Sequence, residues 1–215
     1  MWPRIVGFLV VWLAVAFALS WVQRTEFFQG FFAGLMIGIL GLFVMVFLVA
    51  TGIAQRQMGG AAEQWTAELF NELDRGRWFV AHDVSFGSVK IDHVLVGPGR
   101  IYAVETKWTS WQGNTRFVKG ALACAERNAV KLSSLLASHD LLRKVTPLVV
   151  VWGPHTREMQ AEPEWLDGVG LVAGVHAESW LSKLRSSGRD VARDLSAERA
   201  IADYVEQRQP HEDLR

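Results

Sequence analysis

The fold is decided by residues 89–108, which read VKIDHVLVGPGRIYAVETKW. Two apolar runs, 89–96 and 100–108, are rich in β-branched residues, and the Gly-Pro-Gly between them at 97–99 is typical of a turn. We therefore predict two antiparallel strands joined by a short connection. A further strand over 78–84 precedes them, which extends the pair to a three-stranded antiparallel meander.

Working outward from this segment, apolar periodicity predicts one α/β domain over residues 56–208, followed by a loose tail at 209–215. Gly59-Gly60 predicts a chain break before this domain. Residues 146–152 (TPLVVVW) predict a fully buried strand. The remaining predicted elements are helices at 61–75, 120–139, 176–186 and 190–208, and a strand at 168–174.

The second and third predicted strands carry charged residues inside apolar runs. Side chains alternate along a strand, so Glu105 and Lys107 share one face of the third strand. On the second strand Asp92 shares a face with Val94 and Val96. The other face of the second strand is expected to hold Ile91, His93 and Leu95. The turn at the Gly-Pro-Gly segment then brings Asp92 close to Glu105.

Two carboxylates that converge repel each other unless a cation lies between them. A divalent metal meets this need, and carboxylate oxygens suit Mg²⁺ or Mn²⁺. Lys107 is placed to orient a water molecule or to stabilise negative charge, and Glu63, on the preceding helix, could add a ligand. This set suits metal-assisted phosphodiester hydrolysis. The alternative is an ordinary Glu105–Lys107 ion pair beside a solvated Asp92.

The first third of the chain has the composition of a membrane segment. Its first 54 residues contain only three charged side chains, Arg4, Arg24 and Glu26. Two uncharged stretches, at about 5–22 and 27–54, are each long enough to cross a bilayer. Residues 1–55 therefore predict a two-helix transmembrane hairpin. The alternatives are a buried soluble hairpin, and a cleaved signal peptide that leaves the second helix as the anchor.

The positive charges around this hairpin favour a cytoplasmic location for both of its ends. Arg4 flanks the first stretch, whereas Arg24 alone lies in the turn. Three arginines follow the second stretch: Arg56, Arg75 and Arg77. The expected location is the inner membrane of a bacterium, multi-pass, with the soluble domain in the cytoplasm. Three glycines at four-residue spacing suit packing against the first helix or homo-oligomerisation: Gly30, Gly34 and Gly38.

The overall composition excludes several classes of protein. Half of the residues are apolar, which excludes a disordered chain. The formal net charge is zero, which excludes a protein that coats nucleic acid through bulk charge. Cys124 is the only cysteine, which excludes an intramolecular disulfide framework and a cysteine-built zinc site.

Three segments resemble the nuclease-related domain (NERD) family, which belongs to the PD-(D/E)xK restriction-endonuclease-like superfamily. They are GGAAEQWTAELFNEL at 59–73, VKIDHVLVGPGRIYAVETKW at 89–108 and ALACAERNAVKLSSLL at 121–136. The block IDHVLVGPGRIYAVETK is the specific part. The resemblance covers about half of the soluble domain well and the region after Trp152 poorly.

This resemblance implies a restriction-endonuclease-like central mixed sheet flanked by helices, and a divalent-metal-dependent nuclease acting on DNA, with RNA possible as a substrate. Asp92 and Glu105 would be metal ligands, Lys107 would position water and stabilise charge, and Glu63 would be an accessory acid. The family often carries a supporting glutamine on its second core helix. That position aligns with Cys124 here, so the support is changed.

The helix predicted over 120–139 offers a face for substrate. Arg127 and Lys131 recur on it with Ser134 and Ser138, and two cations precede it, Arg116 and Lys119. Phosphates could lie along this face, or it could be an ordinary solvated surface. Beyond Lys107, two tryptophans could stack on an unpaired base, cover the sheet or touch the membrane interface: Trp108 and Trp111.

Two functions follow from the sequence. The first is a membrane-anchored, Mg²⁺- or Mn²⁺-dependent nuclease that hydrolyses phosphodiester bonds in DNA. The second is a catalytically inactive nuclease-like module that binds nucleic acid or a protein partner at the membrane. Intact Asp92, Glu105 and Lys107 favour the first, and the change at Cys124 favours the second.

Overall fold

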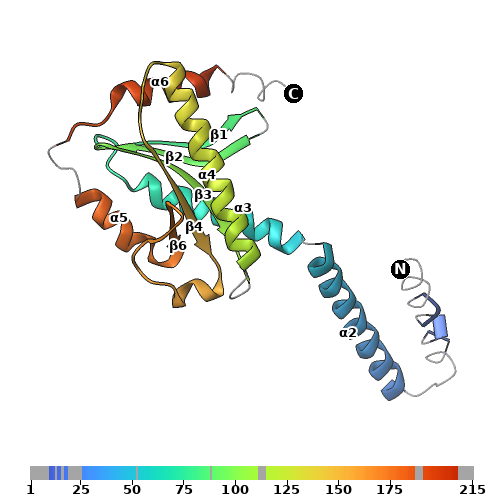
Figure 1. Cartoon of the computed structure of the whole chain (residues 1–215). Coiled ribbons are helices and arrows are strands. Elements are labelled where there is room, and N and C mark those ends of the chain that lie inside the picture. Colours follow the sequence, from blue (N-terminus) through green and yellow to red (C-terminus); the bar gives the residue numbers. More distant parts are fainter. Residues whose placement is uncertain are drawn as a thin grey trace. The chain divides into compact units, whose positions relative to one another are not determined.

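The computed structural model describes residues 10–12, 14–15, 17–18, 26–51, 53–87, 89–110, 115–186 and 191–207 (Figure 1). Contacts within the chain divide it into two compact units, Met1–Arg56 and Gln57–Arg215. Each unit is described by itself below.

The N-terminal unit contains the helix α2 (Glu26–Thr51). Within it, Gly30–Leu48 is a 19-residue segment of mean hydropathy 2.7 with none of its length buried. By length and composition this segment can cross a membrane, and it is the one such helix in the described part of the chain. Most of the first predicted membrane helix, 5–22, lies outside the described residues, so one candidate helix stands where the sequence predicts a hairpin.

The three glycines of α2 lie in open surroundings. A Cβ atom added at Gly30, Gly34 or Gly38 would meet no described atom within 4 Å, apart from the backbone of the helix itself. The partner helix that the sequence predicts for them falls largely outside the described residues. Packing against that helix and self-association both stay predictions.

The C-terminal unit is built on a six-stranded mixed sheet with the order β1-β2-β3-β4-β6-β5. The first three strands form the predicted antiparallel meander, β3 runs parallel to β4 and β4 parallel to β6, and β5 is antiparallel at the edge. The strands are β1 (Phe79–Phe86), β2 (Val89–Gly97), β3 (Arg100–Trp108), β4 (Val145–Trp152), β5 (Glu164–Leu166) and β6 (Val169–Ala173).

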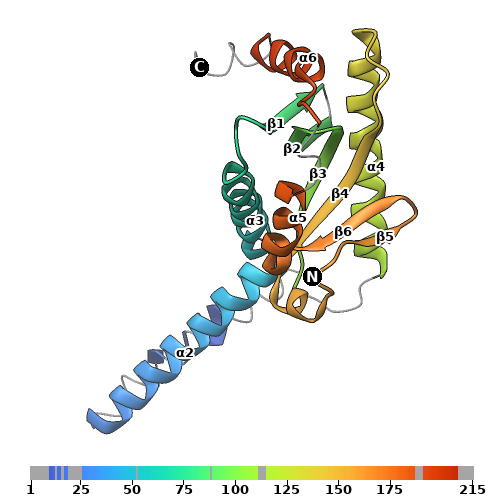
Figure 2. The same cartoon turned by 90° about the vertical axis from the view of Figure 1, so that its left-hand side faces the viewer.

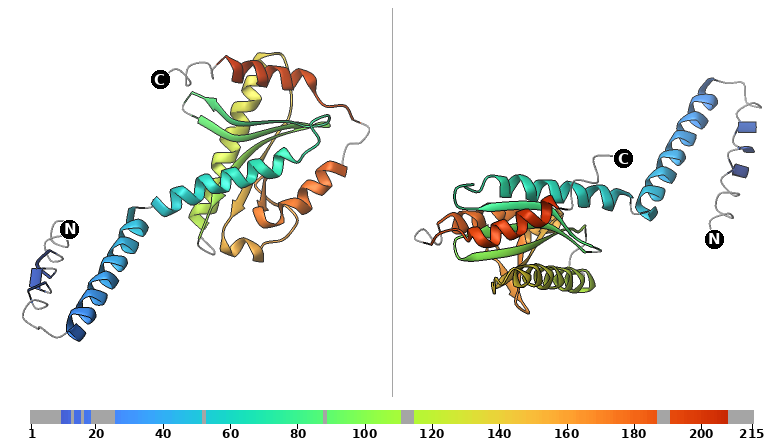
Figure 3. Two further views of the ribbon diagram at one scale, coloured as in Figure 1. Left: turned by 180° about the vertical axis from the view of Figure 1, so that it is seen from behind. Right: turned by 90° about the horizontal axis from the view of Figure 1, so that it is seen from above.

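Helices cover both faces of this sheet, as an α/β fold requires (Figures 2 and 3). On one face, α4 and α6 bury apolar side chains against Val94 and Val96. On the other face, Phe70 of α3 and Trp180 of α5 pack against Leu95. The helices are α3 (Ile53–Asn71), α4 (Thr115–Ser138), α5 (Ala177–Ser186) and α6 (Leu195–Glu206), with the short 3₁₀ helices η1 (Pro154–Glu158) and η2 (Gly174–His176).

Some predicted boundaries are wrong. The predicted break at Gly59-Gly60 is absent, since both glycines lie inside α3, which begins at Ile53 and ends at Asn71 rather than spanning 61–75. Glycine lowers helix stability by about 1 kcal/mol without forbidding the helix. The last helix begins at Leu195 rather than 190, because the Asp194 carboxylate accepts a hydrogen bond from the Ala197 amide at 3.1 Å and caps it.

The short strand β5 was not predicted, and the predicted tail at 209–215 lies outside the described residues. Three residues of β5 are too few to show an alternating pattern, and two of them are exposed. The remaining core elements agree with the sequence within a few residues, including the buried strand β4.

The predicted alternation along β2 is broken at Asp92. Ile91 lies in the α4–α6 core with Val94 and Val96, not on the face of His93 as predicted. The β1–β2 register pairs His82 with His93 and Val84 with Ile91 and passes over the aspartates between them. Asp83 adopts a φ of 56°, so the pleat is interrupted there and both strands change face. Asp92 therefore lies at a local irregularity rather than in a regular strand.

Gly97 is required by the ring of Trp78. A Cβ at position 97 would lie 2.2 Å from that buried indole, at the end of β2. We expect Gly97→Ala to lower the free energy of unfolding by about 1–3 kcal/mol, because the ring or the strand must shift. Denaturant unfolding checks this. Gly120→Ala is the matched control: a Cβ there would meet no described atom within 4 Å apart from the nearby backbone of its own helix, so the change should raise stability by about 0.5–1 kcal/mol in helix α4.

Candidate active site

Asp92 lies where the β2–β3 ladder ends. The register of the two strands runs from Gly97–Arg100 to His93–Val104, and Asp92 follows beyond the last of these pairs. Its Oδ2 accepts a hydrogen bond from the backbone N–H of Thr106 at 2.7 Å. The Asp92 carboxylate thus takes the place of a β2 carbonyl as the hydrogen-bond acceptor for β3. This bond holds the buried acid beside β3.

Glu105, on β3, is the second buried acid. It is 3% exposed and carries partners on both carboxylate oxygens. Oε1 forms an ion pair with the Lys107 ammonium, and Oε2 accepts a hydrogen bond from Nδ2 of Asn128 at 2.7 Å. Because Asn128 belongs to α4, the helix that covers this face of the sheet fixes the glutamate from above. The site therefore joins Asp92, Glu105, Lys107 and Asn128.

The electrostatics of these groups favour an added cation. Burial, and then the nearby charge of Glu105, raise the pKa of Asp92 to about 7 from its ordinary value of 3.8. Burial lowers the pKa of Lys107, but its hydrogen bond with Glu105 and the charges of Glu105 and Asp92 raise it by more, so the net shift is upward. Lys107 thus stays an ammonium, whereas Asp92 resists ionisation in the absence of further positive charge.

Two buried carboxylates fit a hard divalent cation by the chemistry of their oxygens. Asp92 and Glu105 supply the donors, and a cation beside them would offset the cost of ionising Asp92. Within the described residues, no group of three or more His, Cys, Asp or Glu side chains is arranged to hold a metal.

Glu63 lies at the margin of the site rather than in it. Its carboxylate is 3.7 Å from the ammonium of Lys90, which also contacts Asp83 at 2.7 Å. The charge of Glu63 nevertheless contributes to the raised pKa of Asp92. The geometry places Glu63 as an outlying acid, while its predicted roles as ligand and accessory acid stay predictions.

Asn128 is the residue that sequence reasoning missed. Cys124, which the sequence analysis predicts at the position of the family's supporting glutamine, is half-buried near Glu105, and burial followed by that charge raises the pKa of its thiol. One helical turn later, Asn128 supplies the amide instead. It is 1% exposed in an apolar stripe that includes Ala125 and Leu132, and a polar residue in such a stripe is the signal that could have identified it.

Removing this amide should weaken both stability and activity. Asn128→Ala leaves a buried carboxylate oxygen of Glu105 without its donor, which costs about 1–3 kcal/mol. Loss of such a supporting contact also lowers metal affinity or activity by about 10- to 100-fold. Thermal unfolding and metal titration check the two effects. Asn71→Ala, at an exposed amide on α3, is the control and should change neither by a comparable amount.

The four predicted substrate-binding cations all lie on the exposed surface of α4: Arg116, Lys119, Arg127 and Lys131. Arg127 is near the site, since its charge acts on the Cys124 thiol. The two serines predicted for the same stripe bond to their own helix instead, because Ser134 donates to the carbonyl of Val130 and Ser138 to that of Leu135.

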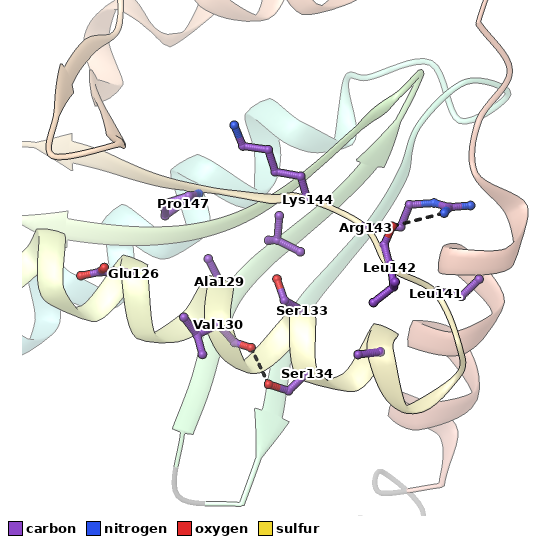
Figure 4. A pocket seen from close by; sticks show the side chains of 12 residues that line it. Glu126, Ala129, Val130, Ser133, Ser134, Leu141, Leu142, Arg143, Lys144 and Pro147 are labelled. Atoms are coloured by element: carbon purple, nitrogen blue, oxygen red, sulfur yellow. Dashed lines mark hydrogen bonds between the residues drawn. The ribbon is translucent and has the colours of Figure 1, made fainter.

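Ser134 also lines a separate pocket of about 680 Å³ between α4 and the segment leading into β4 (Figure 4). Neither Arg127 nor Lys131 lines it. Of the predicted stripe, Ser134 therefore lines this pocket, whereas the cations are exposed on α4 and do not line it.

The histidines on β1 and β2 contact each other within the sheet. His82 Nδ1 and His93 Nδ1 are 2.8 Å apart, and the ring of His93 packs edge-on against Phe70. Burial, followed by the charge of His82, lowers the pKa of His93 to about 3. His93 therefore stays neutral and lies on the face opposite to the α4 core, away from Glu105.

Comparison with known proteins assigns this domain. No curated protein and no solved structure matches the chain. The family model of the nuclease-related domain, NERD, matches residues 58–152, which include β1 to β4 and every member of the site. The fold and the paired acids are consistent with the PD-(D/E)xK superfamily. Residues 58–152 of this chain therefore form a nuclease-related domain.

Proposed function

We propose that this protein is a divalent-metal-dependent nuclease that hydrolyses phosphodiester bonds in DNA. The observation that carries the proposal is the buried cluster at the end of the β2–β3 ladder. Two acids, 7% and 3% exposed, meet one ammonium and one amide there. A fold gains little stability from burying two like charges together, so the arrangement is better explained by chemistry than by packing.

Asp92 and Glu105 are the residues that would hold Mg²⁺ or Mn²⁺. When bound, such an ion would lower the pKa of a water molecule and neutralise charge on the phosphate. Asn128 keeps Glu105 in place through its amide, and the Thr106 N–H does the same for Asp92. These hydrogen bonds preorganise the two carboxylates before substrate arrives.

Lys107 acts on the substrate side of the site. The side chain of Lys107 is partly exposed, whereas that of Glu105 is buried. The Lys107 ammonium can therefore contact a phosphate oxygen of the substrate while its backbone stays in β3. An ammonium there orients the attacking water and stabilises the negative charge that develops on the phosphate. The cations of α4, Arg127 and Lys131 among them, would hold the flanking phosphates of the strand.

We also propose that α2 anchors the nuclease to the inner membrane of a bacterium, with the domain in the cytoplasm. The support is the length and hydropathy of Gly30–Leu48 and its exposed side chains. Such an anchor would restrict the enzyme to nucleic acid that reaches the bilayer.

A catalytically inactive module that binds nucleic acid or protein is the second candidate. The observation that favours it is the pairing of Lys107 with Glu105, together with the absence of a three-residue ligand group among the described residues. Both would follow if the cluster served only as a buried ion pair.

One incubation separates the two candidates. The full chain in detergent micelles is mixed with labelled single-stranded DNA, duplex DNA and RNA, in Mg²⁺, Mn²⁺ or EDTA. The nuclease predicts cleavage of DNA that requires either metal and stops in EDTA. If the folded protein binds the strands but leaves them uncleaved in Mg²⁺, Mn²⁺ and EDTA alike, the result would support the inactive module and contradict the nuclease.

A further inference from the structure

A second pocket, of about 880 Å³, opens at the carboxyl ends of β3 and β4 on the side of α3. Three tryptophans from three different elements line it: Trp65, Trp108 and Trp152. The ring of Trp65 lies 6.1 Å from that of Trp108 and 5.3 Å from that of Trp152, both at steep angles. Its volume falls within the range of about 300–1,000 Å³ that small-molecule sites occupy.

The tryptophans are held in place by the fold rather than simply buried in the core. Nε1 of Trp152 donates to Oγ1 of Thr66 at 2.8 Å, and Thr66 donates in turn to the carbonyl of Ala62 at 2.9 Å. A Cβ at Gly174 would lie 2.3 Å from the Trp152 ring, so only glycine leaves room for this orientation. Trp65 remains 36% exposed. The result is a fixed aromatic wall with an accessible face.

The charges around this wall limit what can bind. Arg157, from η1, is exposed at the rim. Two carboxylates of opposite charge also line the pocket: Glu68 on α3, and Glu72 directly after the end of that helix. Glu72 is paired with Arg185 at 3.3 Å. One cation suits one phosphate, and two carboxylates disfavour a ligand with several phosphates. A carboxylate can also accept a hydrogen bond from the exocyclic amino group of a base.

The pocket adjoins the proposed catalytic site through β3. Trp108 follows Lys107 directly at the end of β3, where the Lys107 side chain lies on the α4 face of the sheet and the Trp108 side chain on the α3 face. The Thr109 N–H bonds to the carbonyl of Trp152 at 2.9 Å, which fixes the ends of β3 and β4 together. A strand whose phosphate lies at Lys107 would pass around the carboxyl ends of β3 and β4 to place a neighbouring base against the tryptophans.

From these observations we propose that the pocket binds one unpaired nucleobase of the substrate, stacked on Trp65, with its phosphate at Arg157. The inference rests on the proposed nuclease function and adds a substrate class to it. A base inside a duplex is stacked on both faces and cannot enter, so the preferred substrates are single strands and frayed or overhanging ends.

The test measures binding in EDTA, where metal-dependent hydrolysis is suppressed. The full chain in detergent micelles is titrated against a fluorescein-labelled single strand of about ten nucleotides, and against a blunt duplex of the same sequence. Wild type should bind the single strand more tightly than the duplex. Trp65→Ala should weaken single-strand binding at least about fivefold, the lower end of what one stacked base contributes.

Two further variants show that such a loss reports stacking. Trp65→Phe keeps an aromatic face and should retain most of the affinity, whereas a purely structural role for the indole would not be rescued in this way. Trp165→Ala removes a tryptophan that is 56% exposed on β5 and lies outside the pocket, and it should bind as wild type does. Circular dichroism confirms that each variant is folded.

The stacking pocket and the nuclease activity can be contradicted independently of each other. Unchanged single-strand binding by folded Trp65→Ala would overturn the stacking pocket, whether or not wild type cleaves DNA. Conversely, a wild type that never cleaves in Mg²⁺ or Mn²⁺ contradicts the nuclease, and binding that still depends on Trp65 would leave the pocket standing.

Discussion

Lys107→Ala is expected to lower the rate of DNA hydrolysis by about 10²- to 10³-fold. The ammonium of Lys107 forms an ion pair with Glu105 and is the one cationic side chain that the structure places within the acid cluster of the described residues. Its removal takes away the group that stabilises charge on the phosphate. Cleavage rates of a labelled strand in Mg²⁺, at saturating enzyme, measure this loss.

The matched control is Lys183→Ala. Lys183 also forms an ion pair with a glutamate, Glu162, but both side chains are more than half exposed on the surface. This variant should cleave at the wild-type rate. Equal rates for the Lys107→Ala variant and wild type would remove Lys107 from the mechanism.

Asp92→Asn is expected to make the protein more stable at pH 8 in the absence of metal. The pKa of Asp92 is raised to about 7, from an ordinary value of 3.8, so the folded state holds its proton more tightly than the unfolded state does. The stability that this proton confers is complete below pH 3.8 and is lost as the pH rises to about 7. Asparagine stays neutral and can still accept from the Thr106 amide.

The difference in unfolding free energy should therefore depend on pH. It is near zero at pH 4 and grows to at most about 4 kcal/mol at pH 8. Urea titrations of wild type and variant in EDTA, at pH 4, 6 and 8, measure it. Asp203→Asn, at an exposed position on α6, is the control and should change the unfolding free energy little. A variant that is less stable than wild type at pH 8 would show that ionised Asp92 supports the fold.

Much of the site could be predicted because the turn of a hairpin and the period of its strands determine which residues are neighbours. Two strands joined by a short turn bring Asp92 close to Glu105, and a period of two places Lys107 on the same face as Glu105. The interruption at Asp83 could not be predicted in this way, since a non-glycine residue with φ of 56° leaves no mark in an apolar pattern. Ile91 was therefore assigned to the wrong face.

The contribution of α4 was harder to predict than that of the strands. Helical periodicity identifies the buried stripe, but which of its polar members meets Glu105 depends on how far the helix slides along the sheet. Alignment with the family pointed to Cys124, and the amide comes from Asn128, one turn further on. A buried asparagine at 1% exposure needs a partner, and that requirement is the physical clue the spacing rule lacks.

In the N-terminal unit, the sequence predicts a membrane helix directly, but the structure does not address how that helix is oriented. Composition alone identifies a helix long enough for a bilayer, and the structure agrees on Gly30–Leu48. The charge bias used for orientation rests on five arginines, and the two that flank the first predicted helix, Arg4 and Arg24, lie outside the described residues. The hairpin, its orientation and its location therefore stay predictions.

The measurement that tests the central claim most directly is the unfolding temperature of the full chain at pH 8, with EDTA, Mg²⁺ or Mn²⁺. A metal that binds only the folded state stabilises it by about 2.7 kcal/mol at a hundred times its Kd. We expect wild type to gain several degrees with either metal, and Asp92→Asn to gain none. An unchanged wild type, or an equal gain in the variant, would contradict a metal centre at Asp92 and Glu105.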